Sequence, residues 1–173
     1  MKKWLPWTIA GVAALWVLWG MRLPKDPSWA VQDFGKLPLM SNGRFQPMDS
    51  LARNVLLQLR EKQSVYLKNE TPPRSMPATE WLMEVFMKPA QADQRQIFRI
   101  DNPEVISLLR LPTKNPQTGQ DGKHFSWNQL KPTLGEIDNQ ARRAGQIEGA
   151  RRTSFERAII QLQNKLFQYM RLK

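Results

Sequence analysis

The sequence predicts a mostly helical protein, in which a transmembrane helix precedes a small extracytoplasmic helical domain with at most short strands. Three features lead to this prediction: an uncharged apolar run near the N-terminus, short apolar-periodic segments bounded by proline, and a long helical pattern at the C-terminus. The sequence divides into a predicted transmembrane anchor at 1–21 and a Pro-rich linker at 22–40. A small helical domain at 41–125 and a long basic C-terminal helical segment at 126–173 follow.

The first predicted element is a membrane-spanning helix over residues 4–21. The run lacks charged residues, and its 18 residues span about 27 Å as an α-helix, close to the thickness of a bilayer's hydrocarbon core. Tryptophans near both ends resemble interfacial aromatic belts. A cleaved signal peptide is the alternative, but no small-x-small cleavage site precedes Arg22. These features favour an uncleaved signal anchor.

Charge alone does not orient this anchor, because Lys2 and Lys3 before it are balanced by Arg22 and Lys25 after it. Most of the chain follows the anchor, which favours an N-terminus in the cytoplasm. The predicted location is therefore the bacterial inner membrane, with a single pass and the bulk of the chain on the periplasmic side.

The segment after the anchor contains several prolines and predicts an extended linker, with a short strand at 37–40. The turn Asn42-Gly43 precedes a helix that starts at Pro47 and Asp49 or Ser50. Its apolar face consists of Leu51, Ala52, Val55, Leu56 and Leu59. A polar helix end and a proline-rich loop, TPPRSMP, follow.

The middle of the chain predicts two more helices and a strand. Thr79 is the predicted N-cap of a helix that ends near Met87. Residues 97–100 predict a brief strand, which could pair with 124–126 only across a third helix. That helix begins after an Asx cap at Asn102, with Pro103 in its first turn.

The C-terminal segment opens with the capping box Ser126-x-x-Gln129 and keeps a helical pattern to the end of the chain. Gly145 and Gly149 weaken its middle, so the pattern predicts either two helices in a hairpin or one long helix with a soft centre. Apolar residues spaced by three and four form a coiled-coil-like seam. The seam needs a partner helix, in this chain or another.

A net charge of +11 fits either nucleic acid or an anionic membrane or acidic partner. The anchor favours the second reading, so nucleic acid is not an expected partner. The C-terminal basic residues predict either a solvated helix face or a docking surface for anionic lipid or an acidic protein. The candidate docking residues are Arg142, Arg143, Arg151 and Arg152.

Residue types argue against catalysis and cofactors. Cysteine is absent, which excludes disulfides, thiolate nucleophiles and covalent haem attachment by this chain. His124 is the single histidine, so we expect it to be a surface or half-buried packing residue. The acid pairs Glu80/Glu84 and Asp101/Glu104 fit helix capping and solvated helix faces. We therefore expect no enzyme activity, no metal and no cofactor.

Several motifs together resemble System II cytochrome c maturation proteins, in the extracytoplasmic part of fused cytochrome c synthetases. The motifs are Leu37-Pro38, Asn42-Gly43-Arg44, PMDSLAR at 47–53, Trp81-Leu82 with Pro89, IFRIDNPEV at 97–105 and FSWNQLKP at 125–132. That family continues into a membrane bundle with a tryptophan-rich haem-binding loop and haem-ligating histidines. The resemblance therefore implies its extracytoplasmic module without the haem-handling part.

Within the resemblance, Arg44, Asp49 and Arg53 are expected to be fold or docking residues. Two functions follow as hypotheses. The first is a non-catalytic single-pass scaffold that docks a membrane assembly linked to c-type cytochromes. The second is a permanent structural accessory subunit of a photosynthetic or respiratory membrane complex. In both, the partners are membrane lipid through residues 4–21 and other subunits of a membrane complex.

Overall fold

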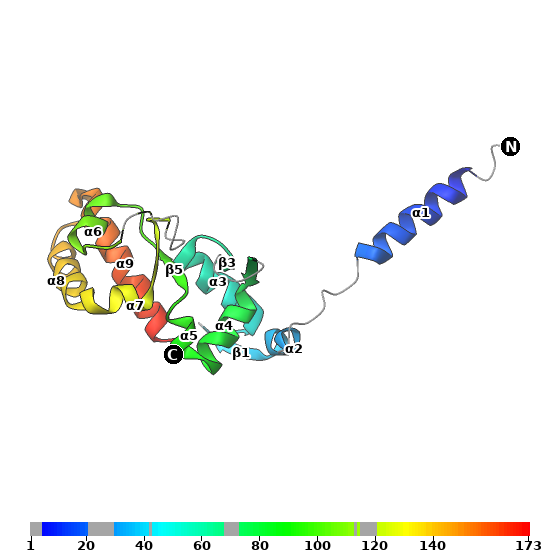
Figure 1. Ribbon diagram of the computed structural model, residues 1–173, viewed down its shortest axis with the longest axis horizontal. Coiled ribbons are helices and arrows are strands. Elements are labelled where there is room, and N and C mark those ends of the chain that lie inside the picture. Colours follow the sequence, from blue (N-terminus) through cyan, green and yellow to red (C-terminus); the bar gives the residue numbers. More distant parts are fainter. Residues whose placement is uncertain (1–4, 21–29, 42, 68–72, 113, 115–120) are drawn as a thin grey trace. The chain divides into compact units, whose positions relative to one another are not determined.

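The computed structural model describes residues 5–20, 30–41, 43–67, 73–112, 114 and 121–173. The chain divides into two compact units, Met1–Ala30 and Val31–Lys173, the second of which is called the body below. The first unit contains helix α1 (Leu5–Gly20), which lies within the predicted anchor (Figure 1). In the described residues, no helix is both long enough and apolar enough to cross a bilayer.

The body is mostly helical and its strands are short, as predicted. Its α-helices are α2 (Val31–Lys36), α3 (Met48–Arg60), α4 (Ala78–Met87), α5 (Pro89–Ala92), α6 (Pro103–Leu108), α7 (Trp127–Leu130), α8 (Leu134–Gly145) and α9 (Ser154–Met170), with 3₁₀ turns η1 (Lys131–Thr133) and η2 (Gly149–Arg151). Its strands are β1 (Pro38–Ser41), β2 (Arg44–Pro47), β3 (Ser64–Leu67), β4 (Arg74–Pro77), β5 (Gln96–Arg99) and β6 (His124–Ser126).

In the described residues, six strands form three two-stranded antiparallel sheets, and each sheet leads directly into a helix. The first unit of this kind is β1–β2–α3, the second is β3–β4–α4, and the third is β5–β6–α7 with α6 between its strands. We call them the first, second and third hairpin units. The predicted pairing of 97–100 with 124–126 across the third helix is confirmed, and the pairs run from Gln96 opposite Ser126 to Arg99 opposite His124.

The first two hairpin units share one junction between strand and helix. Pro47 is the N-cap of α3 and Pro77 is the N-cap of α4, both with extended backbone. Proline suits this place because its φ is fixed and it offers no N–H to a partner strand. In both units an arginine, Arg44 or Arg74, stands three residues earlier at the start of the strand. Pro77 makes Ala78 the first helical residue, so the predicted N-cap role of Thr79 is wrong.

The sequence prediction missed the second hairpin unit's sheet. Strands β3 and β4 lie where a polar helix end and a proline-rich loop were expected. Their inward residues Val65 and Met76 are 2% and 3% exposed, so burial stabilises this hairpin. Most of the connection before β6, residues 113 and 115–120, lies outside the described residues.

All three hairpin units and α9 share one core. Tyr169 of α9 stacks on Trp81 with ring centroids 6.5 Å apart, and meets Phe98 edge-on at 5.5 Å. Residues on both sides of the predicted boundary between 125 and 126 contribute to this aromatic cluster and lie in one compact unit. The body begins within the predicted linker 22–40, because Val31 and Phe34 of α2 are already buried in it.

The C-terminal segment forms two helices, α8 and α9, that pack against each other. This resolves the two predicted alternatives in favour of a helical hairpin, and the seam's partner helix lies in this chain. Helix α9 begins at a capping box in which Thr153 and Glu156 satisfy each other's backbone N–H groups. In Figure 1, α9 runs from beside α6 towards the C-terminus near α5.

Candidate functional site

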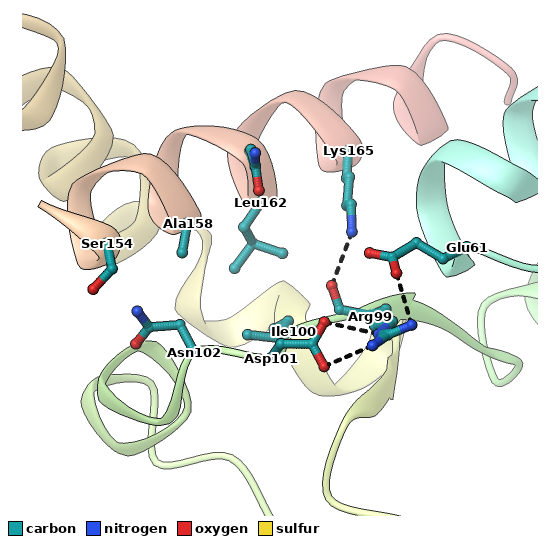
Figure 2. Close-up of a pocket in the computed structure, with 10 residues that line it drawn as sticks. Glu61, Arg99, Ile100, Asp101, Asn102, Ser154, Ala158, Leu162 and Lys165 are labelled. Carbon is teal, nitrogen blue, oxygen red and sulfur yellow. Dashed lines mark hydrogen bonds and ion pairs between the residues drawn. The ribbon is translucent and has the colours of Figure 1, made fainter. Parts of the chain in front are cut away.

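A charged pocket of about 330 Å³ lies where α3 ends, beside β5, the start of α6 and α9. Figure 2 shows acidic and basic side chains from these elements pointing towards one another. Its polar lining consists of Glu61, Arg99, Asp101, Asn102, Ser154, Gln161 and Lys165. The pocket therefore gathers residues from both halves of the sequence.

Arg99 is at the centre of this pocket. Its Nη1 lies 2.7 Å from Oε2 of Glu61, and its Nε lies 2.8 Å from Oδ2 of Asp101. Lys165 of α9 donates from Nζ to the backbone oxygen of Arg99 at 3.0 Å. Glu61 adopts left-handed backbone at the C-terminus of α3, with φ 61°. This conformation is uncommon outside glycine and ends the helix next to Arg99.

The pKa directions of the pocket's side chains indicate that these charges stabilise one another. Burial would raise the pKa of Asp101, but the hydrogen bond and charge of Arg99 outweigh it and lower the pKa. Burial lowers the pKa of Lys165, against the opposing effect of Glu61 and Asp101. A carboxylate held ionised by arginine is a poor general acid. The arrangement fits holding α9 against α3 and β5 better than proton-transfer chemistry.

Two of the motif residues form a joint between hairpin units. Oδ2 of Asp49 lies 2.7 Å from Nε of Arg53, and Thr79 donates its hydroxyl proton to Oδ1 of Asp49. Burial would raise the pKa of Asp49, but the hydrogen bonds from Arg53 and Thr79 lower it. Asp49 and Thr79 are the second residues of α3 and α4. Gly35 packs here, since an added Cβ would lie 3.1 Å from Cγ2 of Thr79.

Arg44 is not part of that joint. It begins β2 with an exposed side chain, and among the described residues no ion pair or hydrogen bond links it to Asp49 or Arg53. Its counterpart Arg74 binds Glu80 through two hydrogen bonds of 2.8 and 3.0 Å. The structure thus separates the three motif residues into a joint and a surface arginine.

The two acids expected on a solvated helix face, Glu80 and Glu84, are in fact buried at 8% and 2% exposure. Glu84 accepts two hydrogen bonds from Arg95, of 2.7 and 3.0 Å, and Glu80 binds Arg74 as described. The solvated reading failed because the arginine partners lie outside α4, on β4 and after α5, where helical spacing cannot place them.

The candidate basic residues of the C-terminal segment have different roles. Arg152 donates from Nε to the backbone oxygens of Ala144 and Ile147 at 3.1 and 2.9 Å, so it caps the C-terminus of α8. Arg142 is exposed and pairs with Asp138, and Arg151 lies 3.7 Å from Glu148. Arg143 is exposed. Arg152 is therefore a fold residue, and the others remain surface residues.

Asp93 forms a second cluster that sequence reasoning missed. It accepts a hydrogen bond from the Tyr169 hydroxyl at 2.9 Å and pairs with Nζ of Lys173 at 2.8 Å. Lys173 also lies over the Trp127 ring, 5.6 Å from its centroid. Burial raises the pKa of the Tyr169 hydroxyl, and the hydrogen bond to Asp93 and the charge of Asp93 raise it further. No local signal marks Asp93, because its partners lie 76 and 80 positions away.

His124 matches the expected packing role. It lies on β6 with its side chain 12% exposed, and Nδ1 contacts Oδ2 of Asp121. Burial would raise the pKa of Asp121, but hydrogen bonds from the backbone and side chain of His124 and the backbone of Lys123 lower it to about 2. Within the described ranges, no group of three or more acids or histidines could hold a metal ion.

The sheet of the first hairpin unit carries exposed apolar side chains. Met40 and Phe45 are cross-strand partners and are 68% and 83% exposed, and Leu37 just before them is 51% exposed. We call the cross-strand pair Met40 and Phe45 the apolar hairpin face. Isolated exposed apolar residues are ordinary, but a paired methionine and phenylalanine indicate a contact surface.

A scan of protein-family models finds none that matches this chain, and a search of curated proteins finds no match either. The resemblance to System II cytochrome c maturation proteins therefore stays a prediction from the motifs.

Proposed function

We propose that this chain is a non-catalytic, membrane-anchored scaffold whose body docks a membrane assembly linked to c-type cytochromes. The contrast between the two compact units carries the proposal. Helix α1 has no charged residue and exposes its large apolar side chains, whereas the body encloses its own core. The exposed side chains include Ile9, Val12, Leu15, Trp16, Val17 and Leu18. An apolar helix of this kind needs an apolar cover.

In this proposal the cover is the lipid bilayer. The 16 residues of α1 span about 24 Å, and the uncharged run continues in sequence from Trp4 to Met21. The protein is then a single-pass protein of the bacterial inner membrane with its body on the periplasmic side. The link to c-type cytochromes rests on the System II motifs.

The charged clusters of the body support a scaffold rather than an enzyme. Each cluster joins elements that are distant in sequence: Asp49 joins α3 to α4, Asp93 joins the end of α5 to the end of α9, and Arg99 joins α3 to β5. Such clusters rigidify a body that must present a fixed surface to partners.

Anchoring is tested by replacing Val12 and Leu15 together with lysine in the full chain. Each charge near the centre of a membrane helix costs about 2.5–3.5 kcal/mol, so this variant should leave the carbonate-resistant membrane fraction. The matched control Val12→Leu/Leu15→Ile should stay in that fraction. Equal retention of both variants would contradict the anchor.

The assembly role is tested by deleting the gene and staining membrane proteins for covalent haem. Loss of all c-type haem, restored by the full chain but not by the double-lysine variant, is the expected result. Normal haem staining with the loss of one membrane complex would overturn the assembly role in favour of a permanent accessory subunit.

A further inference from the structure

We infer that the sheet of the first hairpin unit is a membrane-surface contact, in which the apolar hairpin face enters the headgroup region of an anionic bilayer beside Arg44. The inference rests on the proposed anchor and adds a second, peripheral contact of the body. The observations that carry it are the inverted polarity of this hairpin, its local charge and its short tether.

The polarity of the hairpin is inverted relative to its counterpart. Both sheets have the same register, because Pro47 pairs with Pro38 and Pro77 pairs with Ser64. In the second hairpin unit the inward pair, Val65 with Met76, is buried. In the first, the inward pair is Leu39 with the polar Gln46, both half-buried, and the apolar pair Met40 with Phe45 faces outward.

This inversion is not a requirement of the fold. The second hairpin unit makes the same strand–proline–helix junction with Tyr66 and Ser75 at the outward positions. Phe45 is nonetheless 83% exposed, against 57% for Tyr66. An aromatic side chain at this exposure contributes little to the body's own core, so its use lies in contact with something outside it.

The charge around the apolar hairpin face complements an anionic surface. Arg44 lies next to Phe45 and is exposed, whereas Lys36, just before the hairpin, pairs with Asp33 at 3.2 Å. No acidic residue occurs between Asp33 and Asp49. Basic residues beside aromatic and aliphatic ones are typical of segments that lie in a lipid interface.

The position of this sheet in the sequence agrees with a lipid contact. Ten residues lie between Gly20 and Val31, and they span at most about 35 Å even when fully extended. β1 begins seven positions after Val31, and Met48 binds the backbone oxygen of Leu37 at 2.9 Å, which fixes the hairpin to α3. In sequence, this sheet is the first one after α1.

The absence of cysteine allows single labels without removing native residues. The full chain is reconstituted in vesicles of three parts phosphatidylcholine to one part phosphatidylglycerol, with a fluorophore on Met40→Cys. Tyr66→Cys is the matched control on the equivalent outward position, and Val12→Cys reports the anchor. Quenching by bromine-labelled lipid is compared with quenching by aqueous iodide.

We expect the label at position 40 to be quenched by lipid roughly threefold more than the label at 66, because only the first hairpin enters the interface. Adding Phe45→Ser or Arg44→Ser, or using vesicles of phosphatidylcholine alone, should reduce that difference. Both substitutions change exposed side chains, so the body should remain folded.

Equal iodide quenching at 40 and 66 would overturn the inference, while lipid quenching at 12 would leave the anchor intact. Protection of position 40 from both quenchers would also overturn it, because a protein or a second copy would then cover the hairpin. Absence of lipid quenching at 12 would instead refute the anchor itself.

Discussion

The first and second hairpin units have the same backbone plan but place their polar and apolar residues differently. The second unit buries Met76 in its sheet and two glutamates on α4, each paired with an arginine. The first unit exposes Phe45 in its sheet and Asn54 at the α3 position that matches Glu84. One plan thus serves two purposes: both units bury their helices in the core, but only the first presents an exposed methionine–phenylalanine pair on its sheet.

The largest expected difference concerns the buried ion pair of the second unit. Glu84→Gln removes the charge that Arg95 contacts at 2.7 Å, in a site where the two side chains are 3% and 17% exposed. Breaking a buried pair costs about 3–5 kcal/mol of unfolding free energy. Asn54→Ala in the first unit should change it by less than about 0.5 kcal/mol. Urea unfolding of both variants compares their unfolding free energies. Equal losses would refute the difference assigned to the two units.

The inverted sheets predict the next largest difference. Met76→Ala should lower the unfolding free energy by about 2–3 kcal/mol, because it opens a cavity in the core. Phe45→Ala should change it by less than about 0.5 kcal/mol, because the ring is mostly in solvent. Thermal unfolding followed by circular dichroism compares the two. A large loss for Phe45→Ala would show that the ring supports the body after all.

The joint between the units can be measured with a double-mutant cycle on Asp49→Ala and Thr79→Val. Since the Thr79 hydroxyl donates directly to Asp49, the two changes should couple by about 1 kcal/mol. Arg53→Ala combined with Thr79→Val is the comparison and should couple less, because those two side chains interact only through their shared partner Asp49. Additive losses of unfolding free energy in the first cycle would mean that this hydrogen bond does not stabilise the contact between the two units.

The smallest expected effect is a pH dependence in the third unit. The pKa of Asp121 lies at about 2 in the folded protein, against an ordinary value of 3.8. A depressed carboxyl pKa stabilises the fold above the ordinary value, and this stabilisation is lost as pH falls from about 4 to about 2. Asp121→Asn should flatten the stability profile in that window. The side chain is 48% exposed, so added salt should also weaken the effect. An unchanged profile would contradict the assigned pKa.

Local sequence signals predicted the elements whose determinants lie close together. The caps at Asn102 and Ser126 are confirmed, because side chain and backbone partners are within three residues. The apolar spacing on α3 and along α8 correctly predicted helices. The pairing of β5 with β6 was also anticipated, although only as one option across a helix.

Features set by distant partners could not be predicted in this way. No residue close in sequence to Glu84 indicates that Arg95 is its partner, and none close to Asp93 indicates that Tyr169 is its partner. The second sheet was missed because its strands have four residues each and its return strand, RSMP, ends in proline. Of the candidate site residues, Asp49 and Arg53 are four positions apart on α3, so their ion pair is local, but the bond to Thr79 depends on how two helices meet.

Helix α9 has a consequence for the order in which the protein folds. Its bonds join positions far apart, with Lys165 to Arg99 across 66 residues and Tyr169 to Asp93 across 76, whereas the first two sheets close short loops. Distant contacts form slowly, because loop closure costs entropy before packing compensates for it. Trp81 and Phe98 therefore stay open to solvent until α9 docks. A chain that has not yet docked α9 would expose this apolar surface for the whole interval, which makes α9 docking the step where a chaperone would have most effect.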